Sequence, residues 1–159
     1  MAVNIRLTDF ETPDLDELKE FFGAEDDIIK LLDLGKHEWT VEVLGYVFKF
    51  GTLWEWEWRE IYRKLSGLDI VAKEKLLKVE VLTKAIIELI TPSNKKYTFV
   101  KEEEKVALRH LLLSLSPRVI DDLYAAFNYG EEIALKKFKS EVKELERRVK
   151  VNFFVSYGN

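Results

Sequence analysis

Few side chains in this sequence are of the types that usually do chemistry, and their spacing does not suit it. His37 and His110 lie far apart, whereas a metal site needs several His or carboxylate ligands that face one another. The acidic pairs at 26–27 and 121–122 are adjacent in the chain, so on a helix their side chains point about 100° apart. No Walker loop, GxGxxG or GxSxG motif is present. We therefore predict no catalytic residue, metal ligand or cofactor, and expect a protein that is not an enzyme.

The composition indicates in which compartment the protein is expected. The chain has no cysteine, which excludes disulfides, thiol catalysis and zinc–thiolate sites. No apolar run approaches the roughly 20 residues that span a membrane, and the N-terminal residues do not form a signal peptide. We expect no membrane partner and no small-molecule substrate. The expected location is the cytoplasm of a cell, or of a host cell, or a virion assembled there.

The length and residue balance are typical of one folded domain. The chain has 159 residues, 47% hydrophobic and 34% charged, with a net charge of −4. It contains abundant Lys and Glu and no Gln. This bias is typical of thermophile proteins, although an AT-rich genome also raises the content of Lys and Ile.

The stretch 41–61 is the best organised part of the sequence. Apolar and polar residues alternate on either side of Leu44 and Gly45, which predicts two strands and a tight turn. Thr52 and Glu55 have the spacing of a capping box, in which each side chain binds the backbone amide of the other residue. The hairpin is therefore expected to lead directly into a helix.

Three tryptophans alternate along this helix. At about 100° per residue, Trp54 and Trp58 share a face with Tyr62, which predicts that both tryptophans are in the core. Trp56 falls on the opposite face among charged residues that include Arg59 and Arg63. Such an aromatic side chain is either covered by another part of the chain or available to a protein partner. Trp56, Arg59 and Arg63 therefore form a candidate protein interface.

The remaining elements are mostly helical, so we predict an α+β fold, mainly helical, with a small hairpin. Thr12 and Pro13 are expected to start the first helix, Asp69 caps a helix that lasts to about Ile90, and Ser116 with Pro117 starts another helix. The pattern near Asn128 to Gly130 suggests either a kink or two consecutive helices. The predicted segments of this single domain, residues 1–159, are two short helices in 12–34, a hairpin in 38–50, a helical core in 53–149 and an aromatic tail in 151–159.

Two further surfaces are candidates for binding. The second half of the helix that follows Asp69 is apolar nearly all round, so it is either the centre of the core or also part of a subunit interface. The terminal tail is aromatic and β-prone, and an apolar terminus usually docks onto something. Its candidate interface residues are Phe153, Phe154 and Tyr157.

One charge pattern is unusual. Residues 136–150 contain seven Lys or Arg against three Glu, a net +4, whereas residues 1–36 contain ten acidic residues against four basic ones, a net −6. We call the following five positions of one helix face the basic stripe: Lys136, Lys139, Lys143, Arg147 and Lys150. The simplest interpretation is an ordinary solvated helix face. The alternatives are an acidic-to-basic contact between copies and nucleic-acid binding, and we prefer the protein contact because the whole chain is acidic and no aromatic residues interleave with the stripe.

Three blocks between residues 41 and 145 follow a familiar order. Gly45, Phe48 and Phe50 match a G-x-x-F-x-F hairpin, followed by a helix with Lys78, Leu82, Ala85 and Ile86 and another with Val119, Ile120, Asp121 and Leu123. This order resembles small tailed-phage proteins of the baseplate-hub and tail-assembly-chaperone group. The resemblance implies a structural or assembly role without catalytic residues. The three tryptophans have no counterpart in that pattern, which leaves the partner open.

We therefore expect a non-enzymatic structural or assembly protein of a phage tail, baseplate or similar particle, which acts as an oligomer or with other particle proteins. The alternative is a nucleic-acid-associated module that uses the basic stripe.

Overall fold

The computed structural model of the chain describes residues 14–23 and 26–156 and confirms the α+β fold. Six helices and four strands occur in the described part. In chain order these are α1 Leu15–Phe22, α2 Asp26–Asp33, β1 Glu38–Val43, β2 Tyr46–Gly51, α3 Glu55–Leu65, α4 Ile70–Ala85, β3 Ile86–Ile90, β4 Lys96–Thr98, α5 Glu102–Leu113 and α6 Pro117–Ser156.

The four strands form one antiparallel sheet in the order β1-β2-β3-β4. The predicted hairpin is confirmed, with Trp39 opposite Phe50 and Val41 opposite Phe48. At its turn Leu44 has φ 50° and Gly45 has φ 86°, which is the geometry of a type I′ turn, whose twist matches that of the strands.

The prediction of a helix to about Ile90 was wrong. The helix α4 ends at Ala85, and the next five residues form β3, whose Leu89 lies opposite Phe48 and whose Ile86 lies opposite Phe50. The segment IIELI is too short and too apolar for its periodicity to separate a buried helix from a buried strand. Pairing with β2 makes this segment a strand. The expected helical core of 53–149 therefore contains two of the four strands of the sheet, β3 and β4.

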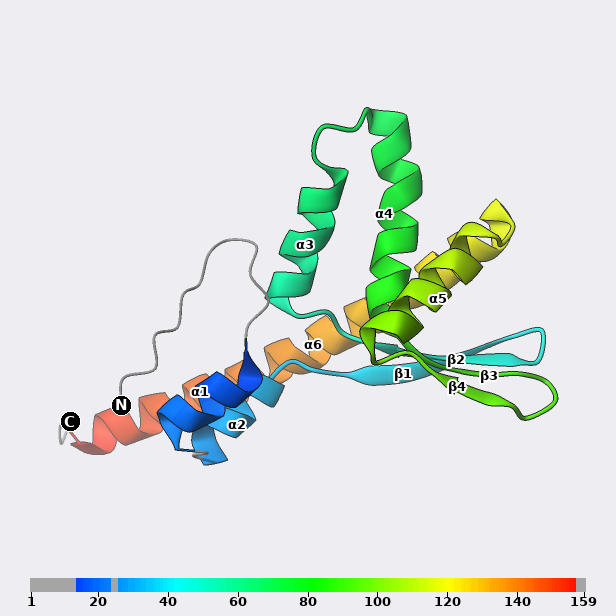
Figure 1. The fold of residues 1–159 in the computed structure, drawn as a ribbon. Coiled ribbons are helices and arrows are strands. Elements are labelled where there is room, and N and C mark those ends of the chain that lie inside the picture. The colour runs from blue at the N-terminus through cyan, green and yellow to red at the C-terminus, as the bar shows by residue number, and fades with distance from the viewer. Residues whose placement is uncertain (1–13, 24–25, 157–159) are drawn as a thin grey trace.

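The helices α4 and α6 pack against the core face of the sheet, and α3 stands beside α4 (Figure 1). The second half of α4 is buried nearly all round, as predicted, and includes the buried polar residues Glu80 and Thr83. The largest fully buried side chains are Phe50, Ile61, Leu82, Ile86, Leu108, Leu112, Leu123 and Phe127.

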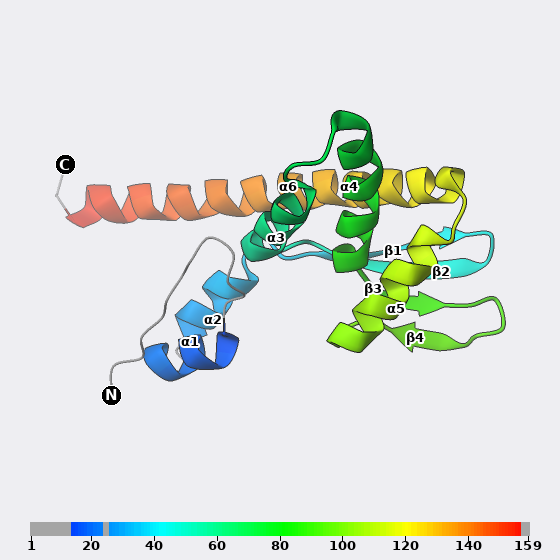
Figure 2. The same cartoon turned by 45° about the horizontal axis from the view of Figure 1, so that its top comes forward.

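The last helix, α6, is continuous for 40 residues, so the predicted kink or break near Asn128 to Gly130 is wrong. It runs from the sheet to the end of the molecule where α1 and α2 lie (Figures 1 and 2). Gly130 interrupts the apolar pattern because the Trp39 side chain occupies the space where its Cβ would be. The helix also includes residues 151–156 of the predicted tail, so the backbone there is not a strand.

Two helix starts differ from their predictions. Thr52 does not form a capping box with Glu55, because α3 begins later in the chain, after Trp54; the Thr52 hydroxyl instead accepts a hydrogen bond from the His37 amide at 3.1 Å. The first residue before α3 is Trp54, whose amide donates to Glu57 Oε1 at 2.8 Å. Asp14 caps α1 through the amides of Asp16 and Glu17, whereas the predicted Thr12 and Pro13 lie outside the described residues.

Candidate interaction surfaces

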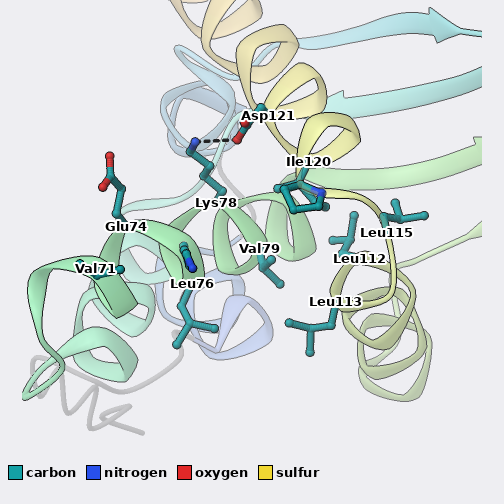
Figure 3. Close-up of a pocket in the computed structure, with 12 residues that line it drawn as sticks. Val71, Glu74, Leu76, Lys78, Val79, Leu112, Leu113, Leu115, Ile120 and Asp121 are labelled. Atoms are coloured by element: carbon teal, nitrogen blue, oxygen red, sulfur yellow. Dashed lines mark hydrogen bonds and ion pairs between the residues drawn. The ribbon is translucent and has the colours of Figure 1, made fainter.

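An open groove of about 450 Å³ lies between α4, the end of α5 and the start of α6 (Figure 3). Val79, Leu112 and Ile120 are buried beside it, whereas Val71 and Leu113 are 63% and 46% exposed at its rim. We call this the α4–α5 groove. Its lining residues are Val71, Glu74, Lys75, Leu76, Lys78, Val79, Leu112, Leu113, Leu115, Pro117, Ile120 and Asp121.

Local sequence explains the shape of the groove. Leu76 and Val79 lie three positions apart, so both point from the same side of α4. On the other side the chain leaves α5 and re-enters a helix at Pro117, where the Ser116 hydroxyl accepts from the Arg118 amide at 3.3 Å. This three-residue connection joins the two helices beside the groove.

The rim of the groove carries charges of both signs. Lys78 Nζ lies 2.7 Å from Asp121 Oδ1, as the dashed line in Figure 3 marks. The hydrogen bond to Asp121 raises the pKa of Lys78. Glu74 and Lys75 are exposed on the same helix. An apolar floor with a polar rim suits apolar side chains of another protein.

A second pocket, of about 850 Å³, lies where four connections meet: α2 to β1, β2 to α3, α4 to β3, and β4 to α5. We call it the lysine–tryptophan pocket. The charged and aromatic residues that line it are Asp33, Lys36, His37, Glu38, Trp54, Trp56, Glu57, Lys84, Phe99, Glu102 and Lys105.

A lysine amine lies over the ring of each tryptophan in this pocket. Lys36 Nζ lies 3.8 Å from the Trp54 ring centroid and donates to the carbonyl oxygen of Thr52 at 2.6 Å. Lys84 Nζ lies 5.4 Å from the Trp56 ring centroid. Such cation–π contacts stabilise a lysine that has lost part of its hydration.

Burial shifts the ionisation of three groups here. It lowers the pKa of Lys105 to about 8, although the nearby Glu57 acts in the opposite direction. Burial also lowers the pKa of Lys36 and raises that of Glu57. Groups shifted toward neutrality are suited to proton transfer, but Lys105 Nζ donates to the carbonyl oxygens of Lys84 at 3.1 Å and Ile86 at 2.8 Å. In the described structure this amine therefore holds the end of α4.

The structure places Trp54 differently from its prediction. Trp54 precedes α3 with φ −74° and ψ 155°, so the helical rotation of 100° per residue does not apply to it. It is half-buried in the pocket together with Trp56, whereas Trp58 packs against the core as expected. Trp56 is thus partly covered by its own chain.

The other predicted interface residues fall on separate surfaces. Arg59 Nε lies 3.3 Å from Glu55 Oε1 one turn away, and Arg63 is exposed on the same helix. Phe153 and Phe154 belong to α6, but their side chains, like all of Tyr157, lie outside the described part. The sequence prediction of an aromatic tail that docks is therefore untested.

The described members of the basic stripe are exposed along the distal half of α6. Arg147 pairs with Glu144 at 2.6 Å. Lys136, Lys139 and Lys143 form no ion pair with another residue of the described ranges. Lys150 lies in the helix, and its side chain is not described.

Neither pocket was predicted from the sequence. Val71 and Leu113 lie on helices close to buried apolar positions, so periodicity alone does not show that their side chains reach solvent. Lys105 carries no sequence signal, because its burial arises from elements that are distant in the chain.

Two features are absent from the described residues. No helix there is long and apolar enough to cross a membrane, and no group of three His, Cys, Asp or Glu side chains is arranged to hold a metal ion. No family model, curated protein or solved structure matches this chain.

Proposed function

We propose that this chain is a non-enzymatic structural or assembly protein of a phage tail, baseplate or similar particle, and that it associates with copies of itself through the α4–α5 groove. The observation that carries the proposal is the groove itself, whose apolar floor reaches solvent between exposed Val71 and Leu113. The resemblance of the three sequence blocks to small tailed-phage proteins supports a phage tail or baseplate as the particle.

The chemistry of the groove suits protein rather than a small polar substrate. Its walls are leucine, valine, isoleucine and proline side chains, and the charged groups stand at the edge. Such a surface gains free energy when another protein fills it with apolar side chains and excludes water. Ile70, which precedes Val71 at the start of α4, is also 82% exposed.

The rim charges favour a second copy as the partner. Glu74 and Asp121 are acidic, and Lys75 and Lys78 are basic, so the rim carries two charges of each sign. In a two-fold interface the same patch meets itself. Lys78 and Asp121 already pair within one chain, so the exposed Glu74 of one copy can meet the exposed Lys75 of the other across a two-fold contact.

Light scattering of the wild type and of Leu113→Glu tests the proposal. The wild type should form a discrete oligomer, and Leu113→Glu should run as a monomer of 18.7 kDa, because a carboxylate in an apolar interface stays unpaired. Leu44→Glu is the matched control: Leu44 is 92% exposed at the hairpin tip, away from the groove. A wild type that is monomeric at every concentration, or equal masses for the two variants, contradicts the proposal.

A second candidate function is nucleic-acid binding through the basic stripe. The observation in its favour is that Lys136, Lys139 and Lys143 are exposed without an acidic partner in the described part. Binding of DNA or RNA should then fall steeply with salt and disappear when these three lysines become Glu. No detectable binding at low salt rejects this candidate.

A further inference from the structure

The strand β1 is an open edge of the sheet. It pairs only with β2 among the described strands, and no backbone hydrogen bond of the described residues joins its other side. It is six residues long and contains neither proline nor glycine. The opposite edge, β4, has three residues, which is how proteins usually limit an edge.

A row of alternating charges crosses the outer face of the sheet and ends at β1. Lys96 of β4 lies 3.0 Å from Glu88 of β3, and Glu88 is opposite Lys49 of β2 in the strand register. Lys49 Nζ then lies 3.1 Å from Glu38 Oε2 of β1. The sign therefore alternates from strand to strand, and the last charge at the open edge is negative.

The outer face of β1 is acidic beyond the row itself. Glu38, Thr40 and Glu42 alternate along the strand and are all exposed. A strand added at this edge would lie about 5 Å away, so its outward side chains would reach these carboxylates. Lys or Arg at the outward positions of the added strand would continue the alternation of charge sign from strand to strand.

The core face of β1 is incompletely covered. Val41 and Val43 are half-buried, whereas Phe48 and Phe50, which lie on the same face of the neighbouring strand, are buried. Phe48 and Phe50 belong to a strand with neighbours on both sides, and Val41 and Val43 do not. Apolar side chains of an added strand would cover the two valines.

We propose that the open edge of β1 binds an extended segment of a partner protein, in which Lys or Arg residues alternate with apolar residues, as a fifth strand of the sheet. Backbone hydrogen bonds to β1 supply the affinity, and the alternate side chains supply the specificity. Glu38 and Glu42 select the basic residues. This surface lies apart from the α4–α5 groove, so the inference does not depend on self-association there.

A second copy of β1 does not fit this edge. Two antiparallel copies would bring Glu38 and Glu42 of both chains onto one face of the joined sheet, and like charges on neighbouring strands destabilise the pairing. The charge row thus selects a basic partner strand and disfavours edge-to-edge association of this chain.

Two synthetic peptides test the proposal with the full-length protein: Thr-Val-Lys-Val-Lys-Val-Thr and its counterpart with Glu in place of Lys. The lysine peptide should slow hydrogen–deuterium exchange of the β1 amides, and the glutamate peptide should bind about tenfold more weakly. The substitution Glu42→Lys should reduce this preference, and Glu38→Lys with Glu42→Lys should reverse it. Glu103→Lys, which changes an exposed acid on α5 that lines neither pocket, is the matched control and should leave it unchanged.

Three results would overturn the proposal: no slowing of exchange at millimolar peptide, equal binding of the two peptides, or protection confined to elements other than β1. If Glu38→Lys disturbs folding by removing the partner of Lys49, the single variant Glu42→Lys still decides the point, because Glu42 is exposed. Leu113→Glu should bind the lysine peptide as the wild type does, which separates this test from that of the groove.

Discussion

At Gly130 the backbone of α6 lies directly against the indole of Trp39, and the absence of a side chain makes the contact possible. The Trp39 ring is in turn stacked on Phe50, with ring centroids 5.9 Å apart, and lies 5.9 Å from Phe127. A single small residue therefore sets how closely the longest helix approaches the sheet.

Gly130→Ala should destabilise the protein by about 1–3 kcal/mol, because the new methyl group forces the Trp39 ring to move within a packed core. Alanine is the better helix former by about 1 kcal/mol, but the overlap with the ring is the larger effect. Urea unfolding measures the change. In the control Gly51→Ala the added Cβ has no neighbour within 4 Å, so a similar loss in both variants would contradict the role of the Trp39 contact.

Lys105 should make stability depend on pH in the alkaline range. Its pKa is lowered from 10.5 to about 8 by burial, so above pH 8 the unfolded chain binds more protons than the folded protein. The free energy of unfolding that Lys105 contributes therefore rises as the pH increases from about 8 to 10.5. After allowance for solvent screening we expect a rise of about 2 kcal/mol.

Lys105→Met removes this dependence. The measurement is the difference in unfolding free energy between wild type and Lys105→Met at a series of pH values. Loss of the hydrogen bonds to Lys84 and Ile86 adds an offset to the difference below pH 8, whereas the titration appears as its slope. A difference that stays level across the window would contradict the assigned pKa.

At the scale of elements, charged side chains connect three helices. Glu80 of α4 is only 3% exposed, and its Oε1 accepts from Arg109 Nε of α5 at 2.7 Å. Its Oε2 lies 3.5 Å from Lys64 Nζ of α3. Lys64 also lies 3.7 Å from Glu60, which pairs with Lys84 at 3.0 Å. The network thus fixes how α3 and α5 are placed on α4.

Glu80→Ala should lower the unfolding free energy by about 2 kcal/mol. Removing one member of a buried ion pair usually costs 3–5 kcal/mol, but Arg109 and Lys64 are partly exposed and retain water after the loss. The control Glu74→Ala removes an exposed acid from the same helix and should change stability by less than about 0.5 kcal/mol. Equal effects of the two substitutions in urea unfolding would show that the network does not stabilise the fold.

At the scale of the whole molecule, the acidic and basic segments lie at one end. The acidic helices α1 and α2 and the basic, distal half of α6 occupy the same side in both views (Figures 1 and 2). The sequence suggested an acidic-to-basic contact between copies. The acidic and basic segments that the structure describes do not lie at opposite ends, which favours the α4–α5 groove for association.

Association through an apolar groove should resist salt. At 1 M salt the Debye length is about 3 Å, so attraction between exposed charges that are farther apart than this is largely screened, whereas burial of apolar surface is not weakened. The mass measured by light scattering should therefore be the same at about 0.05 M and 1 M NaCl. Dissociation at high salt would indicate a charge-driven contact, such as one that involves the basic stripe.

Some features of this protein follow from neighbouring residues alone. The alternation around Leu44 and Gly45 predicted the hairpin, and Asp69 caps α4 by accepting from the Ala72 amide at 2.8 Å, as expected. These features were predictable because turns and caps depend on groups within a few positions of one another.

Other features depend on residues that meet only in the folded protein. The strand β3 exists because Ile86 and Leu89 pair with β2, the break expected at Gly130 is absent because Trp39 fills the space beside a continuous helix, and Trp54 is a cap rather than a core residue. The groove and the open edge of β1 likewise arise from elements that are distant in sequence. Burial and strand pairing are set by such non-local contacts, and for that reason only the tertiary structure decided them.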